Sequence, residues 1–187
     1  LCERLKSINT ALYQHQRTLK MSSCTYKYDV LAAEVKLKDV TSCRHNRALL
    51  HRIKNNDPKI THLAIVRDGM FDDDDSYDDE DFIVRESDDL GIFGYFVGHN
   101  ETIKKISIYH LPADKCRVET MLEGFQRSKT ITSLYITRED EDYPSEGFSA
   151  MNLPHVTSMD VHLSMAMVSE GANYLALGLH RCKSLKQ

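Results

Sequence analysis

The sequence has no tryptophan, only four prolines among its 187 residues, and no apolar run near the ~18 residues that a membrane helix needs. It begins with Leu1 and shows no charged-then-apolar leader, so we expect a soluble fragment or processed chain. Its five cysteines stand far apart, with an odd total and no Cys-x-x-Cys pair. That spacing fits neither a disulfide framework nor a zinc module, and we expect a reducing, cytoplasmic location.

Catalytic motifs are also missing. The chain contains no GxxxxGK[ST], no GxGxxG and no HExxH, the patterns of phosphate-binding loops and zinc helices. His155 and His162 flank an expected strand, but no nearby cysteine or carboxylate completes a set of three metal ligands, so we interpret both as surface residues. Cys182 occupies the same place before its strand as Asn100 and Ser128 do before theirs, which indicates a structural role. We predict no catalytic residue, no metal and no cofactor.

Charge is unevenly distributed along the chain. Residues 1–58 contain eleven basic and five acidic residues, residues 59–89 three and twelve, and residues 90–187 ten and eleven. The basic front end lacks the interleaved aromatic residues of a nucleic-acid surface, so we do not expect a nucleic-acid partner. From Asp68 to Asp81 there are nine acids and no base. Such a run predicts an exposed, solvated loop, and we expect its segment Asp72–Asp81 to be an exposed, mobile insertion that the fold does not need.

The acidic run has two functional interpretations. A calcium loop starting at Asp72 would have Tyr77 where the sharp turn requires Gly and Ile83 where a bidentate Glu is required, which argues against tight calcium binding. Ser76 precedes a cluster of acids and is a candidate for phosphorylation by an acid-preferring kinase. The plain alternative is a solvated insertion without a role of its own.

A six-residue pattern, apolar-x-x-apolar-x-apolar, occurs four times and predicts four strands. The copies are Ile60–Ile65, Ile103–Ile108, Ile131–Ile136 and Val156–Val161, and a fifth copy begins at Leu185. Their starts are separated by 43, 28, 25 and 29 residues, and the last three intervals lie around the period of about 20 to 29 that strand-and-helix solenoids show. The longer first interval indicates an insertion at about residues 68–89.

The segments before three of these strands carry apolar residues at helical spacing, and each begins thirteen residues before its strand. Asp114 and Ser169 are expected N-caps of two of the helices. A further helix is expected to end at Asp57-Pro58. The apolar positions are Leu90, Phe93, Gly94 and Val97; Val118, Met121, Leu122 and Phe125; Ala172, Leu175, Ala176 and Leu179; and, in the further helix, Leu49, Leu50 and Ile53.

Two architectures alternate strand and helix in this way. A doubly wound sheet is covered on both faces, so its strands are nearly continuous apolar runs. Here the fifth position of the pattern is Ala64, Ser107, Tyr135 or Asp160, which indicates one open face. We therefore predict an α/β solenoid with parallel strands on one side and helices on the other.

The strand–helix units resemble leucine-rich repeats of the ribonuclease-inhibitor-like subtype. More narrowly, the stretches 24–30, 49–65, 89–100 and 171–186 are similar to a large leucine-rich-repeat family abundant in diatoms. Two departures are the long acidic insertion and the absence of the strand-ending Asn of the general repeat. The resemblance implies a partial leucine-rich-repeat solenoid that acts as a protein-binding scaffold, and it implies no catalytic residues.

The two ends of the chain are predicted separately from the repeats. We expect residues 1–43 to form an N-terminal helical cap and residues 44–187 to form the repeats. At the other end, Leu185 begins a strand just before the sequence stops, so we expect further repeats or another chain to cover that edge. An apolar helical stripe precedes a strand-like alternation in the cap: Leu1, Leu5, Ile8, Leu12 and Leu19, then Tyr26, Tyr28 and Val30.

The sequence predicts protein binding on the concave face of the sheet. Tyr109 and Tyr135 are the expected anchors, because exposed aromatic residues are enriched among binding hot spots. Lys105 and Asp160 are expected at opposite ends of the sheet, where they would orient a partner by charge, and His162 completes the surface. An α/β enzyme subunit with a site at the strand C-terminal ends and a purely structural subunit are the alternatives. The predicted rows are His62, Lys105, Ser133 and Ser158; Ala64, Ser107, Tyr135 and Asp160; and Val66, Tyr109, Thr137 and His162.

Overall fold

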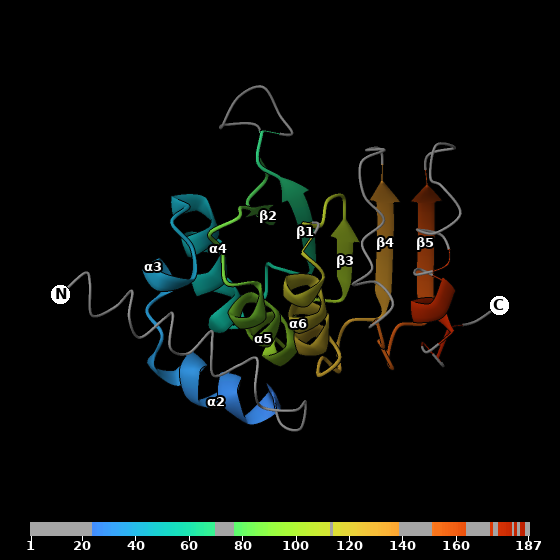
Figure 1. The fold of residues 1–187 in the computed structure, drawn as a ribbon, viewed down its shortest axis with the longest axis horizontal. Coiled ribbons are helices and arrows are strands. Elements are labelled where there is room, and N and C mark those ends of the chain that lie inside the picture. The colour runs from blue at the N-terminus through green and yellow to red at the C-terminus, as the bar shows by residue number, and fades with distance from the viewer. Residues whose placement is uncertain are drawn as a thin grey trace.

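The fold is built on a five-stranded parallel sheet with helices packed against it (Figure 1). The structure is a computed structural model that describes residues 24–69, 77–112, 114–138 and 151–163, together with 173, 176–180, 182, 184 and 185. The strand order is β2-β1-β3-β4-β5. The bounds are β1 His62–Arg67, β2 Asp81–Val84, β3 Lys105–Ile108, β4 Ser133–Arg138 and β5 Ser158–Leu163. The expected α/β class is confirmed, and four strands lie where the repeated pattern predicts them.

Helices connect and flank these strands. They are α2 Cys24–Glu34, α3 Leu37–Val40, α4 Arg44–Lys54, α5 Leu90–His99 and α6 Lys115–Phe125. The predicted N-cap of α6 is confirmed, because the Asp114 carboxylate accepts hydrogen bonds from the backbone N–H groups of Cys116 and Arg117. Asp89 caps α5 in the same way. Residues 176–179 are helical, whereas Ser169 lies outside the described residues. Within the described part, no helix combines the length and apolar character that crossing a bilayer requires.

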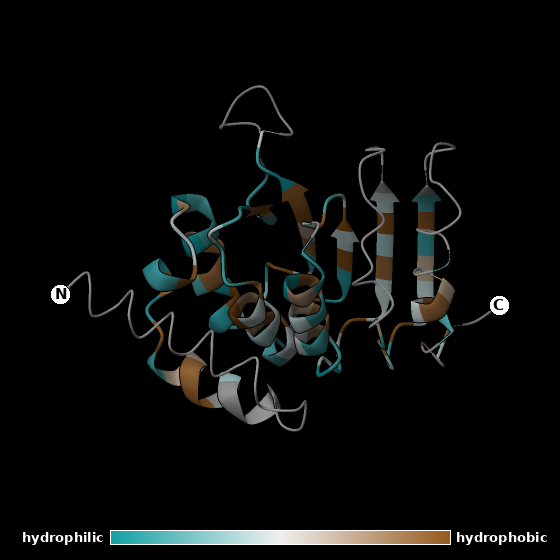
Figure 2. Ribbon diagram, in the orientation of Figure 1, coloured by the Kyte–Doolittle hydropathy of each residue, from teal (hydrophilic) through white to brown (hydrophobic). Residues whose placement is uncertain are grey.

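The core lies between the helices and one face of the sheet. Strand residues such as Leu63, Ile106 and Leu134 are almost fully buried in the same cluster as the apolar residues of α4, α5 and α6. Phe93 of α5 joins the two layers, since its ring stacks on Phe82 with centroids 3.8 Å apart. Figure 2 shows the apolar bands of the strands alternating with polar ones. The period-two pattern therefore divides the sheet into a helix-covered face and an opposite face.

A recurring turn precedes each strand pattern by three residues. The buried Asn100 side chain accepts hydrogen bonds from the N–H groups of Thr102 and Ile103 and donates one to the carbonyl of Ile53. Ser128 accepts the bond from the equivalent N–H of Ile131. Cys182 is also buried at this position, and burial raises the pKa of its thiol. The structural role predicted for these positions is confirmed.

Two sequence expectations are wrong. The exposed loop expected over Asp68–Asp81 is contradicted at its last residue, because Asp81 begins β2, a buried strand that pairs with β1. The apolar triplet 82–84 after the acids supplies that strand, and the charge run obscured it. The alternation of Tyr26, Tyr28 and Val30 does not make a strand, because this segment is helix α2. Its register is set by tertiary packing, in which the Tyr28 ring fits against Gly91 of α5.

On the edge that does not pair with β1, strand β2 is held by a buried side chain of α4. Asn46 of α4 is fully buried, and its amide group donates to the carbonyl of Ile83 at 2.7 Å and accepts from the N–H of Ile83 at 2.9 Å. Asp88, also buried, accepts from the N–H of Arg85 and lies 3.4 Å from the Asn46 amide nitrogen. Thr41 completes this polar cluster. Burial raises the pKa of the Asp88 carboxyl.

Replacing Asp88 with Asn should stabilise the protein at neutral pH. Because the pKa of Asp88 is raised in the folded state, the folded chain holds this proton more tightly than the unfolded chain. Stability therefore falls as the pH rises from the ordinary Asp value through the raised one. Asp88→Asn keeps an acceptor for the Arg85 N–H and removes the buried charge, so urea unfolding between about pH 4 and pH 7 should show a flatter profile. The exposed neighbour is the control: Asp89→Asn keeps an oxygen acceptor for the α5 cap and should change the unfolding free energy at pH 7 by less than about 0.5 kcal/mol.

Candidate functional site

Strand pairing aligns the predicted binding rows across the sheet. His62 pairs with Lys105, which pairs with Ser133, which pairs with Ser158. The next row, from Ala64 to Asp160, is aligned in the same register. Since all the strands are parallel, each row runs perpendicular to the strands on the face opposite the helices. The predicted alignment of these two rows is confirmed.

The structure brings three predicted site residues into one aromatic row. Tyr109 follows β3, Tyr135 lies on β4 and His162 lies on β5. The ring centroids of Tyr109 and Tyr135 are 5.7 Å apart, and those of Tyr135 and His162 are 5.5 Å apart. Both tyrosines are half-buried, and His162 is exposed. We call Tyr109, Tyr135 and His162 the aromatic row; it crosses three strands and offers both ring faces and polar tips to a ligand.

Two charged residues accompany the aromatic row. The Lys105 ammonium nitrogen lies 5.9 Å from the centroid of the Tyr135 ring, in cation–π range. The Asp160 carboxylate lies 3.1 Å from Nε2 of His162. The expectation that Lys105 and Asp160 stand at opposite ends of the sheet is wrong, because β2 adds a strand beyond β1 and leaves Lys105 on the central strand. Both charged residues therefore lie in the half of the sheet formed by β3, β4 and β5.

The face opposite the helices is not open along its whole length. A second apolar cluster covers β1 and β2, in which Cys43 packs with Ala64, Val66 and Ile83, and Tyr77 and Tyr109 pack on them. Tyr77 is fixed there by its hydroxyl group, which donates to the carbonyl of Arg67 and accepts from the N–H of Gly69. Two predicted rows are therefore buried rather than exposed where they cross β1, at Ala64 and Val66, and Ser107 of β3 is buried as well. We call the exposed part over β3, β4 and β5 the open half of the sheet.

Tyr77 is the residue that sequence reasoning missed. It lies inside the acidic run, where the charge pattern predicts a solvated loop, and its contact with β1 depends on the unpredicted strand β2. The available signal was an aromatic residue among acids, a few positions before the apolar triplet 82–84. Asp78 and Asp79 are exposed as predicted, but the predicted exposed segment Asp72–Asp81 is wrong at its last residue, since Asp81 is buried and its carboxylate accepts from the N–H of Asp78.

His62 marks the boundary between the covered and open halves. Its Nε2 lies 2.8 Å from the hydroxyl oxygen of Ser107, and its Nδ1 lies 3.9 Å from the Glu80 carboxylate. Burial lowers the pKa of His62, and the positive charge of Lys105 lowers it further. Burial raises the pKa of Glu80, and the nearby carboxylates of Asp78, Asp81 and Asp79 add to that shift against the opposing Arg52.

Ser107, His62 and Glu80 follow one another as the serine, histidine and carboxylate of a hydrolase triad do, but their geometry does not support nucleophilic catalysis. The Ser107 side chain is 1% exposed, so a substrate carbonyl cannot approach its oxygen. The Glu80 carboxylate is also beyond hydrogen-bond distance from the ring nitrogen. We therefore interpret the trio as a polar link that joins β3, β1 and the segment before β2.

The remaining predicted residues do not join this region. His155 is exposed in a turn, as expected from the sequence. Among the residues that the structure describes, no group of three His, Cys, Asp or Glu side chains is placed to hold a metal ion. Cys43, Cys116 and Cys182 are unpaired thiols. Ser76, the phosphorylation candidate, lies outside the described residues.

Comparisons with known proteins do not identify the chain. No protein-family model matches it, and no curated protein matches it. Among solved structures, it is similar to one described as leiomodin-1 actin-binding site 2, with 16% sequence identity and a TM-score of 0.37. The similarity covers 72% of this chain and 90% of that chain.

Proposed function

We propose that this protein is a partial leucine-rich-repeat solenoid that binds another protein through the open half of its sheet. Equivalent positions of the repeated pattern pair between β1 and β3, between β3 and β4, and between β4 and β5, which supports stacked repeats. A second ladder joins the residues just before the strands: the N–H of Lys104 donates to Thr61, that of Thr132 to Lys104, and that of Thr157 to Thr132. The same contact therefore recurs between each pair of neighbouring copies.

The aromatic row carries the functional part of the proposal. Tyrosines supply a large apolar area with a polar tip and are enriched at the energetic centres of protein interfaces. Here Tyr135 lies between two other rings, with Lys105 over its face. The covered half of the sheet cannot serve as this surface, because Ala64 and Val66 are already buried by Tyr77 and Tyr109. The open half is where a partner would dock.

Replacing Tyr135 with Ala should remove most of the partner's affinity. Tyr135 belongs to the aromatic row but not to the cluster over β1 and β2, whereas Tyr109 belongs to both, so Tyr135→Ala is the cleaner variant. Partners are captured from the source cell with the immobilised wild-type protein and identified by quantitative mass spectrometry. Affinity for each purified candidate is then measured by calorimetry. A fall of about tenfold or more is expected, which is the loss of one interface anchor.

The matched control is a tyrosine in the helical layer. Tyr95 of α5 is half-buried and stacks on His99 with centroids 4.1 Å apart, so Tyr95→Ala makes the same truncation away from the open half. It should leave the affinity within about twofold of wild type. If both variants are folded and Tyr135→Ala loses less than about threefold, the binding surface is elsewhere. The described residues offer no arrangement that favours the enzyme-subunit or structural-subunit alternatives.

A further inference from the structure

Helix α4 carries a solvent-facing surface made only of basic and neutral residues. Its sequence contains no acidic residue, and its apolar positions face the core. Four residues spaced three or four apart lie on one side of the helix, because such spacing repeats once per turn. We call them the basic face: Arg44, Arg47, His51 and Lys54.

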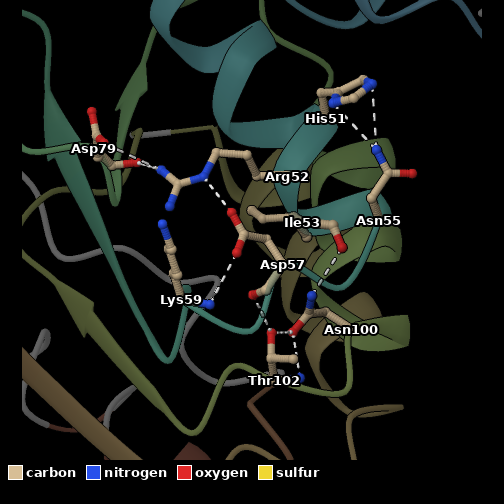
Figure 3. Close-up of polar contacts among 9 residues, drawn as sticks. All are labelled: His51, Arg52, Ile53, Asn55, Asp57, Lys59, Asp79, Asn100 and Thr102. Carbon is tan, nitrogen blue, oxygen red and sulfur yellow. Dashed lines mark hydrogen bonds and ion pairs between the residues drawn. The ribbon is translucent and has the colours of Figure 1, made fainter.

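Arg44, Arg47 and Lys54 of the basic face have no acidic partner among the described residues, in contrast to Arg52 and Arg85. Arg52, on another side of α4, pairs with Asp57 at 2.8 Å and with Asp79 at 3.5 Å (Figure 3). Arg85 pairs with Asp68. By contrast, no ion pair forms at Arg44, Arg47 or Lys54 among the residues that the structure places. Arg47 donates only to the backbone carbonyls of Thr41 and Ser42, and Lys54 lies over the ring of Phe96.

This arrangement works against the stability of α4. Arg44 and Arg47 occupy the first turn, where the positive end of the helix dipole disfavours cations, and they are close enough to repel each other. The first turn contains no acid, and the N-cap residue Cys43 makes no side-chain capping bond. α5 and α6, in comparison, each begin with a capping aspartate. Local conflicts of this kind are typical of positions kept for binding.

We propose that the basic face of α4 docks an acidic segment of a partner polypeptide. A helix of eleven residues is about 16 Å long, which suits a short peptide segment. A long duplex or a membrane would also meet the exposed, negatively charged Asp79, which lies next to α4 through its contact with Arg52. The basic face has no Phe, Tyr or Trp for base stacking and no large apolar residue for insertion into lipid. This surface is separate from the open half of the sheet and does not depend on the function proposed for it.

Fluorescence anisotropy with fluorescein-labelled octaglutamate tests the proposal. Wild-type protein should bind the peptide at low salt and release it as salt is added. The variant Arg44→Glu/Arg47→Glu should weaken binding by about tenfold or more, because two attractions become repulsions. Its matched control is Lys104→Glu/Lys129→Glu, which makes the same change in net charge at two exposed lysines off α4 and should weaken binding by less than about twofold.

The same titrations distinguish the proposal from its rivals. The α4 variant should unfold at a temperature close to that of wild type, since an acid at the helix N-terminus offsets the loss of the Arg47 bonds. Equal weakening in both variants, or no binding by wild type at low salt, would overturn the proposal. The proposal would also be overturned if wild-type protein bound a short DNA duplex, or vesicles containing phosphatidylserine, more tightly than it binds octaglutamate, and if the α4 variant lost that binding. The Tyr135→Ala experiment tests only the binding surface on the open half of the sheet, so its outcome and that of the α4 variant can be distinguished.

Discussion

Replacing Asn46 with Ala should destabilise the protein by about 3 to 5 kcal/mol, because it leaves both backbone groups of Ile83 buried without a partner. The Asn46 side chain is fully buried and bonds to the carbonyl and the N–H of Ile83 at 2.7 and 2.9 Å. Each orphaned buried group costs about 1 to 3 kcal/mol, and the cavity left by the amide adds to that cost. For a chain of this length the unfolding temperature should fall by roughly 6 to 20 °C.

Circular dichroism during thermal and urea unfolding measures this effect. Asn55→Ala is the matched control, since Asn55 is exposed at the end of the same helix and should change the unfolding free energy by less than about 0.5 kcal/mol. Asn46→Asp separates the two bonds: the carboxylate still accepts from the Ile83 N–H but no longer donates, and it faces Asp88. It should be destabilising at neutral pH and partly recover in acid. Equal stability of the two alanine variants would mean that α4 does not hold the edge of β2.

The repeated pattern predicted most of the sheet because its physical cause is local. Apolar residues at the first, fourth and sixth positions bury one face of each strand, and the paired strands then align copy by copy, as Ile106 and Leu134 do. The helical quartets predicted α5 and α6 for the same reason, since one face of each must be apolar to pack on the sheet. These features repeat along the chain, so a sequence read alone reveals them.

Features that occur once were not predictable in this way. β2 has three apolar residues after a long acidic run. It is a strand because it pairs with β1 on one edge and bonds to the Asn46 side chain on the other. Asn46 itself breaks the apolar pattern of α4, which a sequence reading takes for a solvent-facing position. Tyr77 covers β1 through a contact that depends on β2. The extent of the candidate site was therefore overestimated, because its closure depends on residues outside the repeats.

Replacing Gly124 with Ala should destabilise the protein by about 2 kcal/mol, although Ala is the better helix former by about 1 kcal/mol. α5 and α6 approach each other at glycines: a Cβ atom on Gly124 would lie 2.2 Å from the carbonyl carbon of Gly94. A Cβ on Gly98 would in turn lie 2.0 Å from the Gly124 oxygen. These contacts involve backbone atoms, which no rotamer change can relieve, so the helices must separate.

Exposed Glu123 on the same helix supplies the control, because Glu123→Ala adds no atom to the α5–α6 contact and should leave stability nearly unchanged. Urea unfolding that finds Gly124→Ala as stable as wild type would contradict the close approach of α5 and α6.

The need for glycine between these helices follows from the sheet. Neighbouring strands lie about 4.8 Å apart, whereas packed helices ordinarily lie about 8 to 10 Å apart. Since α5 leads into β3 and α6 into β4, the small residues let the helical layer follow the strand spacing. That spacing also places Tyr109 and Tyr135 in contact on the opposite face.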